Sequence, residues 1–191
     1  VLDEGGAVVD GVIPGVTVPT AMVGVSERGV MTLELTAREA GGHASTPPDF
    51  PATARLARAI DRLHRRPFPT RLVPPVRAML ATVAPHAPQP LRTLFSSLGL
   101  TGPLVAAIFG RLGPEMRAIV RTTAVATRLR GAPGDNVLAT SASASVNIRL
   151  LTGDTVADAM DRVRRVIADP EVEVTLAYGS EPLPVSPWRG E

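Results

Sequence analysis

The feature that most constrains the fold is the alternation of apolar and polar residues in two distant segments, residues 30–37 and 142–150. In the first segment every second position is apolar: Met31, Leu33, Leu35 and Ala37. In the second segment the apolar positions are Ala142, Ala144, Val146, Ile148 and Leu150. A period of two residues predicts strands with one buried face and one exposed face. Such strands favour an antiparallel sheet that is covered on one side.

Two other segments carry apolar residues at helical spacing. The first covers residues 51–65, and its apolar stripe consists of Leu56, Ala59, Ile60 and Leu63. The second begins at Thr155 in a phrase that resembles a capping box, and it stops before Pro170. In both segments the charged residues lie off the apolar stripe, which predicts amphipathic helices that cover a core.

Three more alternating segments predict strands over residues 22–27, 123–130 and 172–176. Counted from residue 30, the order is strand, helix, strand, strand, helix, strand. This order predicts an α+β, ferredoxin-like βαββαβ domain, in which a four-stranded antiparallel sheet carries two helices on one face. Residues 1–20 mix Gly, Val and Pro without a helical period, which predicts a loop or an extended connection.

Residues 67–121 interrupt this order, and nine prolines divide the segment. We expect a mostly helical insertion with short helices over residues 76–83, 90–98, 103–112 and 114–121. Helices this short are marginal alone in water, so their apolar faces must pack on something. They form either a cap that packs on itself or an apolar groove for a ligand.

Composition excludes several classes of protein. All 20 basic residues are Arg, against 18 acidic residues, and they are scattered along the chain. With aromatic residues at 3%, this pattern argues against a nucleic-acid partner. The absence of Cys excludes disulfides, thiolate zinc sites and Cys nucleophiles. No apolar run approaches the roughly 20 residues of a membrane span. No signal-peptide pattern occurs, which favours a cytoplasmic location.

Three short phrases carry a family resemblance: VLDEGG at residues 1–6, GGHASTP at 41–47, and PGDNVL at 133–138 followed by VNIRLL at 146–151. Their order and spacing resemble the zinc-dependent aminoacylase and carboxypeptidase family, peptidase family M twenty. The similarity is greatest to its carboxypeptidase S-like branch, which includes N-acyl-amino-acid hydrolases. In that family a lid domain, also called the dimerisation domain, interrupts a zinc catalytic domain.

The resemblance implies a domain organisation. Residues 1–20 would be a short piece of the catalytic domain, residues 21–178 the lid with its insertion, and residues 179–191 the return towards the catalytic domain. The chain begins without Met, and we expect it to be a piece of a longer protein. The resemblance also implies a homodimer formed through the lid and two zinc ions in the parent enzyme.

One metal ligand is implied within the chain. Asp3 matches a family zinc ligand, although the neighbouring Glu4 is the alternative by one position, and a solvated acidic turn is the simpler interpretation. The other zinc ligands and the general base would lie outside these residues. We therefore expect this chain alone to be inactive and to hold no zinc tightly.

Three further residues match family positions that contact substrate. His43 matches a His that enters the partner subunit's site and helps polarise the scissile carbonyl, whereas a loop His in solvent is the alternative. Asn136 matches a residue near the scissile bond, or it caps its turn. Arg149 matches an Arg that binds the α-carboxylate, or it is a cross-strand partner of Glu34 or Glu173. His64 and His86 lack such context, and we expect them to be surface residues.

The function implied is that of a lid in a two-zinc carboxypeptidase or N-acyl-amino-acid amidohydrolase, with a small peptide or an N-acyl amino acid as substrate. In such an enzyme the groove alternative for the insertion would suit a long acyl chain. Two other hypotheses remain: a stand-alone ferredoxin-like regulatory domain that binds a small ligand without catalysis, and a membrane-surface module that uses residues 72–112.

Overall fold

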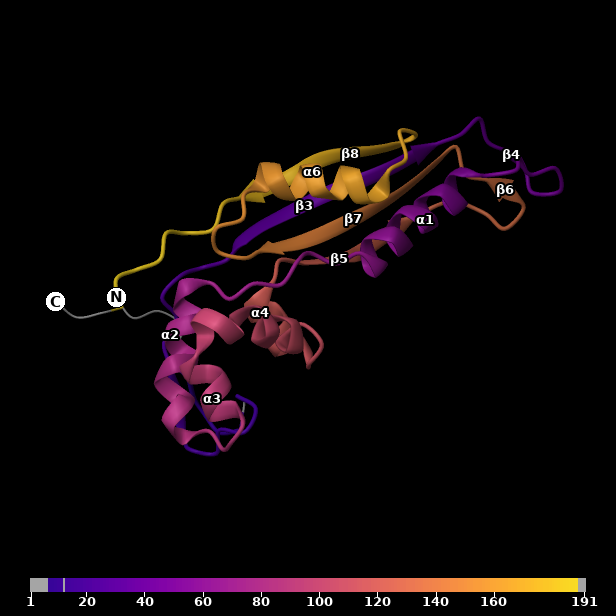
Figure 1. Cartoon of the computed structure of the whole chain (residues 1–191). Coiled ribbons are helices and arrows are strands. Elements are labelled where there is room, and N and C mark those ends of the chain that lie inside the picture. The colour runs from indigo at the N-terminus through magenta and orange to yellow at the C-terminus, as the bar shows by residue number, and fades with distance from the viewer. Residues whose placement is uncertain (1–6, 12, 189–191) are drawn as a thin grey trace.

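The computed structural model describes residues 7–11 and 13–188. Its centre is a four-stranded antiparallel sheet with the strand order β5-β7-β3-β8. The strands are β3 (Gly29–Arg38), β5 (Thr123–Arg130), β7 (Ser141–Leu150) and β8 (Val172–Ser180). Helices α1 (Ala52–Arg65) and α6 (Val156–Ile167) lie side by side on one face of the sheet (Figure 1). The prediction of an α+β, ferredoxin-like βαββαβ fold is therefore confirmed.

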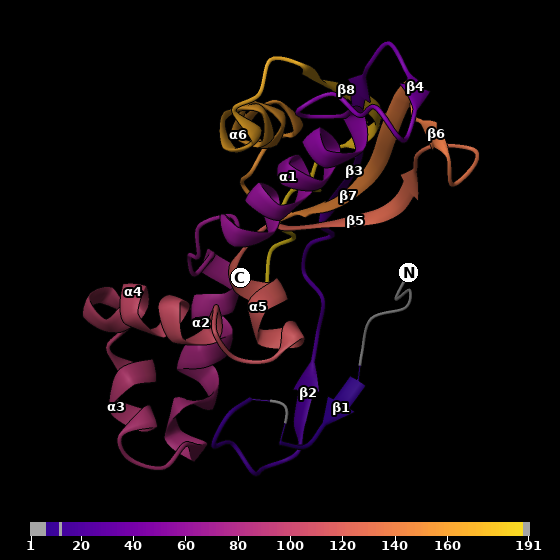
Figure 2. The same ribbon diagram turned by 90° about the vertical axis from the view of Figure 1, so that its right-hand side faces the viewer.

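The alternating residues of β3 and β7 form the main core. Met31, Leu33 and Leu35 are fully buried, as are Ile148 and Leu150. They pack beneath the apolar stripes of the two helices, which contribute Leu56, Ala59, Val163 and Ile167 among others. The residues that alternate with them in sequence point to the opposite face of the sheet. Neither α1 nor α6 covers that face (Figure 2). Period-two patterning alone was sufficient to predict which residues face the helices.

The edge strand β5 departs from simple alternation. Its register against β7 shifts between Ala126 and Arg128, so the strand contains a bulge. A bulge moves the following side chains to the other face. Before the bulge, Ala126 lies opposite Val146 and packs against the core, whereas Val125 lies opposite Asn147 and is 59% exposed. After the bulge, Leu129 lies opposite the buried Ala144, but at this edge of the sheet it remains 68% exposed.

The insertion forms a second helical unit at the end of the sheet where β3 begins (Figure 1). It contains α2 (Pro74–Val83), the short 3₁₀ helix η1 (Ala84–His86), α3 (Leu91–Ser96), α4 (Leu98–Phe109) and α5 (Pro114–Val120). Its core is separate from that of the sheet and includes Leu80, Phe95, Val105, Phe109 and Val120. The rings of Phe95 and Phe109 meet edge to face with centroids 6.3 Å apart. The insertion therefore packs largely on itself.

The expected helix start at residue 103 is wrong, because Pro103 lies inside α4. Proline has no backbone N–H, so a proline within a helix leaves one hydrogen bond of the helix unmade. In α4, Leu98 precedes the proline and Val105 and Phe109 follow it, and all three are buried in the insertion core. The burial of both halves of α4 outweighs the missing hydrogen bond, so the helix continues through the proline.

The prediction for the N-terminal part is also partly wrong. Strands β1 (Ala7–Val9) and β2 (Thr20–Met22) pair with each other, where only a loop and then a strand over residues 22–27 were expected. Residues 23–28 form no strand and run instead beside the returning C-terminal segment. Leu183 N–H donates to Glu27 O at 3.1 Å, and Ser186 N–H donates to Val25 O at 2.7 Å. The outgoing and returning segments thus leave the sheet together.

Candidate functional site

His43 and Asn136 lie at one end of the molecule, which we name the sheet tip: β4 (Gly42–His43), β6 (Val137–Leu138) and their loops. Strands β4 and β6 pair, with His43 opposite Val137. This tip lies at the far end of the sheet from the insertion (Figure 1). Gly41 begins the tip with a φ of +79°, in the left-handed region that favours glycine. The two-glycine phrase therefore turns the chain out of β3 and into the loop that carries His43.

The imidazole of His43 is exposed and oriented by its own loop. The backbone N–H of Ser45 donates to His43 Nδ1 at 3.1 Å, and Ser45 Oγ lies 2.8 Å from the same nitrogen. A backbone N–H can only donate, so Nδ1 is an acceptor, and the neutral ring carries its proton on Nε2. The Nε2–H group is therefore available as a donor to a molecule outside this loop.

The main chain of Asn136 is hydrogen-bonded to the same loop. Its carbonyl accepts a hydrogen bond from Ala44 N–H at 3.0 Å. Its side chain is exposed and makes no hydrogen bond within the residues that the structure describes. The turn-capping alternative for Asn136 requires such a bond, so this alternative has no support here. The Nε2–H group of His43 and the side-chain amide of Asn136 are thus two polar groups at the sheet tip without a partner among the described residues.

Arg149 lies at the opposite end of β7. It is exposed on the open face of the sheet, with Val30 and Thr123 as its neighbours in register. The two carboxylates that are its alternative cross-strand partners are bound elsewhere: Glu34 accepts from Ser145 Oγ at 2.9 Å, and Glu173 pairs with Arg38 at 2.5 Å. The structural alternative for Arg149 is therefore not observed.

The structure does not bring all the predicted site residues together. In the β3–β7 ladder, Arg38 opposes Ser141 at the tip end and Val30 opposes Arg149 at the other end. At about 3.4 Å per residue, the strand between these pairs spans about 27 Å. A single copy therefore cannot place Arg149 and His43 on the same small substrate.

The implied zinc ligand lies near the start of the chain. Asp3 lies outside the described residues, as does its neighbour Glu4. Among residues 7–11 and 13–188, no three His, Asp or Glu side chains are grouped so as to hold a metal ion. Within the same range, no helix is long and apolar enough to cross a membrane.

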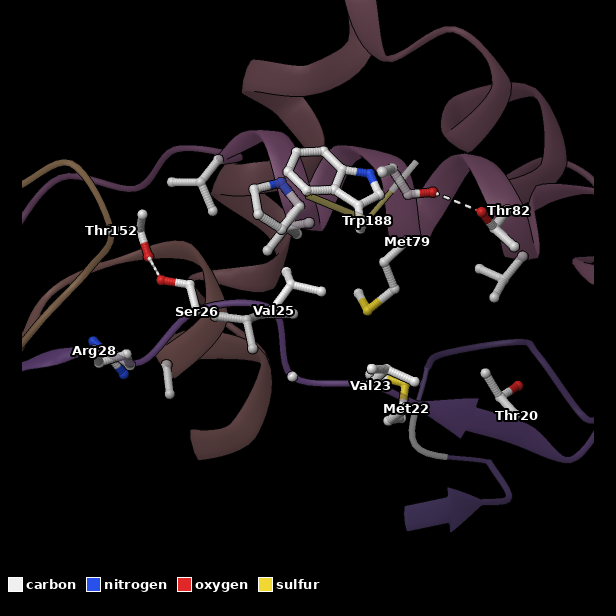
Figure 3. Close-up of a pocket in the computed structure, with 18 of the residues that line it drawn as sticks. Thr20, Met22, Val23, Val25, Ser26, Arg28, Met79, Thr82, Thr152 and Trp188 are labelled. Atoms are coloured by element: carbon white, nitrogen blue, oxygen red, sulfur yellow. Dashed lines mark hydrogen bonds between the residues drawn. The ribbon is translucent and has the colours of Figure 1, made fainter. Parts of the chain in front are cut away.

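An apolar cavity lies at the other end of the sheet, between the insertion and the segments that leave the domain. The sequence predicted a groove of the insertion as one alternative, but not the walls that the connecting segments supply. We name it the junction cavity; its volume is about 550 Å³. Its walls come from residues 20–28, from α2 and α5, from residues 151–152 and from Trp188 (Figure 3). No local pattern reveals it, because these segments are distant in sequence and meet only in the folded chain.

Arg28 closes one end of the junction cavity. Its Nη2 donates to Arg149 O at 2.6 Å and to Arg121 O at 2.9 Å, and its Nε donates to Leu150 O at 3.4 Å. Burial lowers the pKa of the Arg28 guanidinium, and the nearby charge of Arg149 lowers it further. No carboxylate forms a salt bridge with Arg28 among the described residues. Two arginines, Arg28 and Arg149, thus adjoin at this end of the sheet.

Comparison with known proteins identifies relatives of the whole chain. It is 38% identical over 188 residues to an N-fatty-acyl-amino acid synthase/hydrolase of Xenopus tropicalis, covering 98% of this chain and 36% of the relative. The human protein of the same name is 34% identical, with coverages of 98% and 37%. A probable carboxypeptidase S-like 2 of Dictyostelium discoideum is also 34% identical, with coverages of 97% and 36%. The chain thus spans little more than a third of the length of these relatives.

A solved structure shares the fold. Human carnosine dipeptidase 1 superposes with a TM-score of 0.53 at 12% identity, covering 85% of this chain and 38% of that protein. The family model described as Peptidase dimerisation domain matches residues 25–175, which include three strands of the sheet and the start of β8, both covering helices and the insertion. The chain therefore belongs to the peptidase dimerisation domain family.

Proposed function

We propose that this chain is the lid of a zinc-dependent amidohydrolase that acts on N-acyl amino acids, and that it supplies substrate-binding residues to two active sites. The observation that carries the proposal is the separation of two exposed polar groups along one sheet: His43 and Asn136 at the tip, and Arg149 at the junction end. The names of the relatives, which include hydrolases of N-fatty-acyl amino acids, favour this substrate class.

Each residue suits a distinct part of such a substrate. The guanidinium of Arg149 carries a planar fork of donors, which matches a free α-carboxylate. The Nε2–H group of His43 suits the carbonyl oxygen of the scissile amide, where negative charge develops during hydrolysis. The amide of Asn136 lies beside His43 and can bind the same part of the substrate.

The geometry favours a homodimer in which each active site is shared. An N-acyl amino acid places its carboxylate and its amide carbonyl only a few bonds apart, whereas the strand between Arg149 and the tip end of β7 spans about 27 Å, and His43 lies beyond that end. We propose that each site combines Arg149 of one copy with the tip of the partner copy. This arrangement uses both ends of every lid.

The catalytic groups themselves belong to a domain outside the described residues. In the proposal, that domain holds two zinc ions, with Asp3 as one ligand. Zinc ions supply a nucleophilic water at neutral pH and polarise a carbonyl. The contribution of the present chain is to orient the substrate and to stabilise developing charge.

A mixed-dimer experiment tests the proposal on the whole protein that contains this chain. His43→Ala and Arg149→Ala variants are purified separately, then unfolded and refolded together or co-expressed at equal amounts. Random pairing makes half of the dimers mixed, and each mixed dimer has one site with both residues intact, so activity should return to about a quarter of the wild-type value.

The single variants refolded alone provide the control, and each should stay nearly inactive. Activity of the mixture that remains at the level of the single variants would contradict the shared site. A whole protein that hydrolyses no N-acyl amino acid, with zinc present, would contradict the proposed reaction.

A further inference from the structure

We infer that the junction cavity binds the acyl chain of the substrate, so that the insertion selects for long acyl groups. The inference rests on the proposed function, because it names the part of the substrate that this cavity receives. It is carried by three features of the cavity: its apolar walls, its single polar end, and the contact of its Arg28 with Arg149.

The walls are apolar along most of the cavity. Apolar side chains from both connecting segments line it, namely Met22, Val23 and Trp188, and Met79 of the insertion lies among them (Figure 3). The insertion also contributes Val76 and Ile119 to the lining. Three threonines also line it. Two of them have hydroxyls that are already bonded along the walls: Thr20 Oγ1 donates to Val18 O, and Thr82 Oγ1 donates to Ala78 O, each at 3.0 Å. The cavity therefore offers an apolar chain a nearly continuous apolar surface.

The polar groups that remain are collected at one end. Ser26 and Thr152 lie there with their hydroxyls 3.3 Å apart, and Arg28 lies beside them (Figure 3). The Nη1 atom of Arg28 makes no hydrogen bond within the described residues. An apolar body with a cation at one end matches the chemistry of an amphipathic anion, such as a fatty chain that ends in a polar acid group.

The polar end continues into the predicted carboxylate site. Arg28 Nη2 bonds to the main-chain oxygen of Arg149 at 2.6 Å, so the two residues are direct neighbours. Arg149 itself does not line the cavity, but its neighbour Arg28 does. In the inference, a substrate whose carboxylate binds Arg149 places its acyl group at the Arg28 end of the junction cavity. The chain can then extend from Arg28 towards Met22 and Met79, the apolar end in Figure 3. The volume of about 550 Å³ lies within the range of small-molecule sites, about 300–1,000 Å³.

The structure offers a matched pair of variants on one helix. Ala78 of α2 lines the cavity, so Ala78→Phe should fill part of it without disturbing the closed core of the insertion. Ala81 lies on the same helix, is exposed and does not line the cavity. Ala81→Phe therefore adds the same group outside the site. Ala118→Leu on α5 narrows the cavity from another wall and serves as a second variant.

The experiment measures kcat/KM of the whole enzyme for acetyl, octanoyl and hexadecanoyl derivatives of one amino acid. In the wild type, kcat/KM should increase with chain length, by at most about fourfold for each buried methylene. Ala78→Phe should lower kcat/KM for the hexadecanoyl substrate by about tenfold or more, the equivalent of two displaced methylenes. The acetyl substrate should be unaffected, Ala118→Leu should act in the same direction, and Ala81→Phe should match the wild type.

Four outcomes separate the inference from the proposed function. Equal kcat/KM for all chain lengths in the wild type would overturn the inference while leaving the proposed reaction intact. A long-chain preference that both cavity variants leave unchanged, or a loss that is equal for all three substrates, would overturn it as well. Failure of the wild type to hydrolyse even the acetyl substrate would instead overturn the proposed function, and the inference with it.

Discussion

Arg55 of α1 donates two hydrogen bonds from Nη1 to the carboxylate of Asp169, at 3.0 Å to Oδ1 and at 3.2 Å to Oδ2. Arg58 adds a third at 2.7 Å, and the Asp169 side chain is only 5% exposed. Burial raises the pKa of Asp169, but the hydrogen bonds from Arg58 and Glu171 N–H and the charge of Arg55 outweigh it, so the pKa lies below its usual value. This ion pair fixes α1 to the turn between α6 and β8.

We expect Asp169→Asn to destabilise the chain by about 1.5–3 kcal/mol at neutral pH, the usual range for hydrogen bonds to a charged group. Because the pKa of Asp169 is lowered in the folded state, its contribution is complete above the unfolded pKa of about 3.9. The contribution is lost as the pH falls through the lower pKa of the folded state. Urea unfolding at pH 7 and at progressively lower pH should show the variant and the wild type converging in acid.

The exposed pair Asp61–Arg65 provides the control for this prediction. Its Oδ2–Nε distance is 2.8 Å, but the side chains are 53% and 75% exposed, respectively. Ion pairs this exposed contribute little to stability, because water and salt screen the two charges. If Asp61→Asn lowered the unfolding free energy as much as Asp169→Asn does, burial of Asp169 would not explain the loss of stability in the Asp169 variant.

A second prediction concerns Thr122, whose side chain is 1% exposed. Its hydroxyl donates to the carboxylate of Asp154 and accepts from Leu151 N–H at 2.8 Å. Asp154 also pairs with Arg71 at 2.7 Å, so this group connects the insertion to the end of β7. Thr122→Val keeps the shape but leaves the Leu151 N–H without its partner, and we expect a loss of about 1–3 kcal/mol in unfolding free energy.

Thr122→Ser is the matched variant, because it retains the hydroxyl and removes only the methyl group. In thermal or urea denaturation the wild type should be the most stable, Thr122→Ser less stable and Thr122→Val the least stable. The reverse order for the two variants would mean that packing of the methyl group, rather than the hydrogen bonds, makes Thr122 important.

A third prediction concerns the sheet tip. Gly41 has a φ of +79°, and a Cβ atom there would lie 2.7 Å from Thr140 Cγ2. Gly41→Ala should therefore destabilise the chain by about 1 kcal/mol or more and displace the loop that carries His43. Gly134→Ala, in the neighbouring turn, meets no atom closer than 3.9 Å and should be tolerated. Heteronuclear NMR shifts of His43 would report the displacement, and identical spectra in both variants would contradict it.

A fourth prediction addresses substrate recognition by the whole enzyme. Arg149→Lys keeps the charge but loses the planar fork, so preference for a free α-carboxylate over a carboxamide should fall. The expected loss is about 1.5–3 kcal/mol in the ratio of the two kcat/KM values. Arg128→Lys, on the same open face beside Ser145, provides the control. An unchanged preference in Arg149→Lys would leave Arg149 without a role in recognition.

A fifth prediction concerns zinc binding by the 191-residue chain itself. Structural and catalytic zinc sites normally use three or four protein ligands, and the described residues contain no such group. Calorimetric titration with zinc should therefore show only weak binding, and added zinc should produce no amide hydrolysis. Tight binding at a stoichiometry of one or two ions would contradict the assignment of the metal site to a separate domain.

Local patterns in the sequence were sufficient for most of the fold. The period of two in residues 30–37 and 142–150 is a property of the strands themselves, so it predicted their buried faces directly. The helical stripe over residues 51–65 and the start at Thr155 depend only on neighbours three or four positions away. These patterns persist in the folded chain because each strand or helix must bury the side that is already apolar.

Tertiary contacts decided the rest. Pro103 remains within a helix because the insertion core buries residues on both sides of it. The register of β3 against β7 separates Arg149 from His43, which sequence spacing alone does not reveal. The junction cavity is lined by Arg28, Met79 and Trp188, which come from three segments that are far apart in the chain. A cavity is the space left between packed segments, so no single segment encodes it, and only the complete set of long-range contacts determines where it lies.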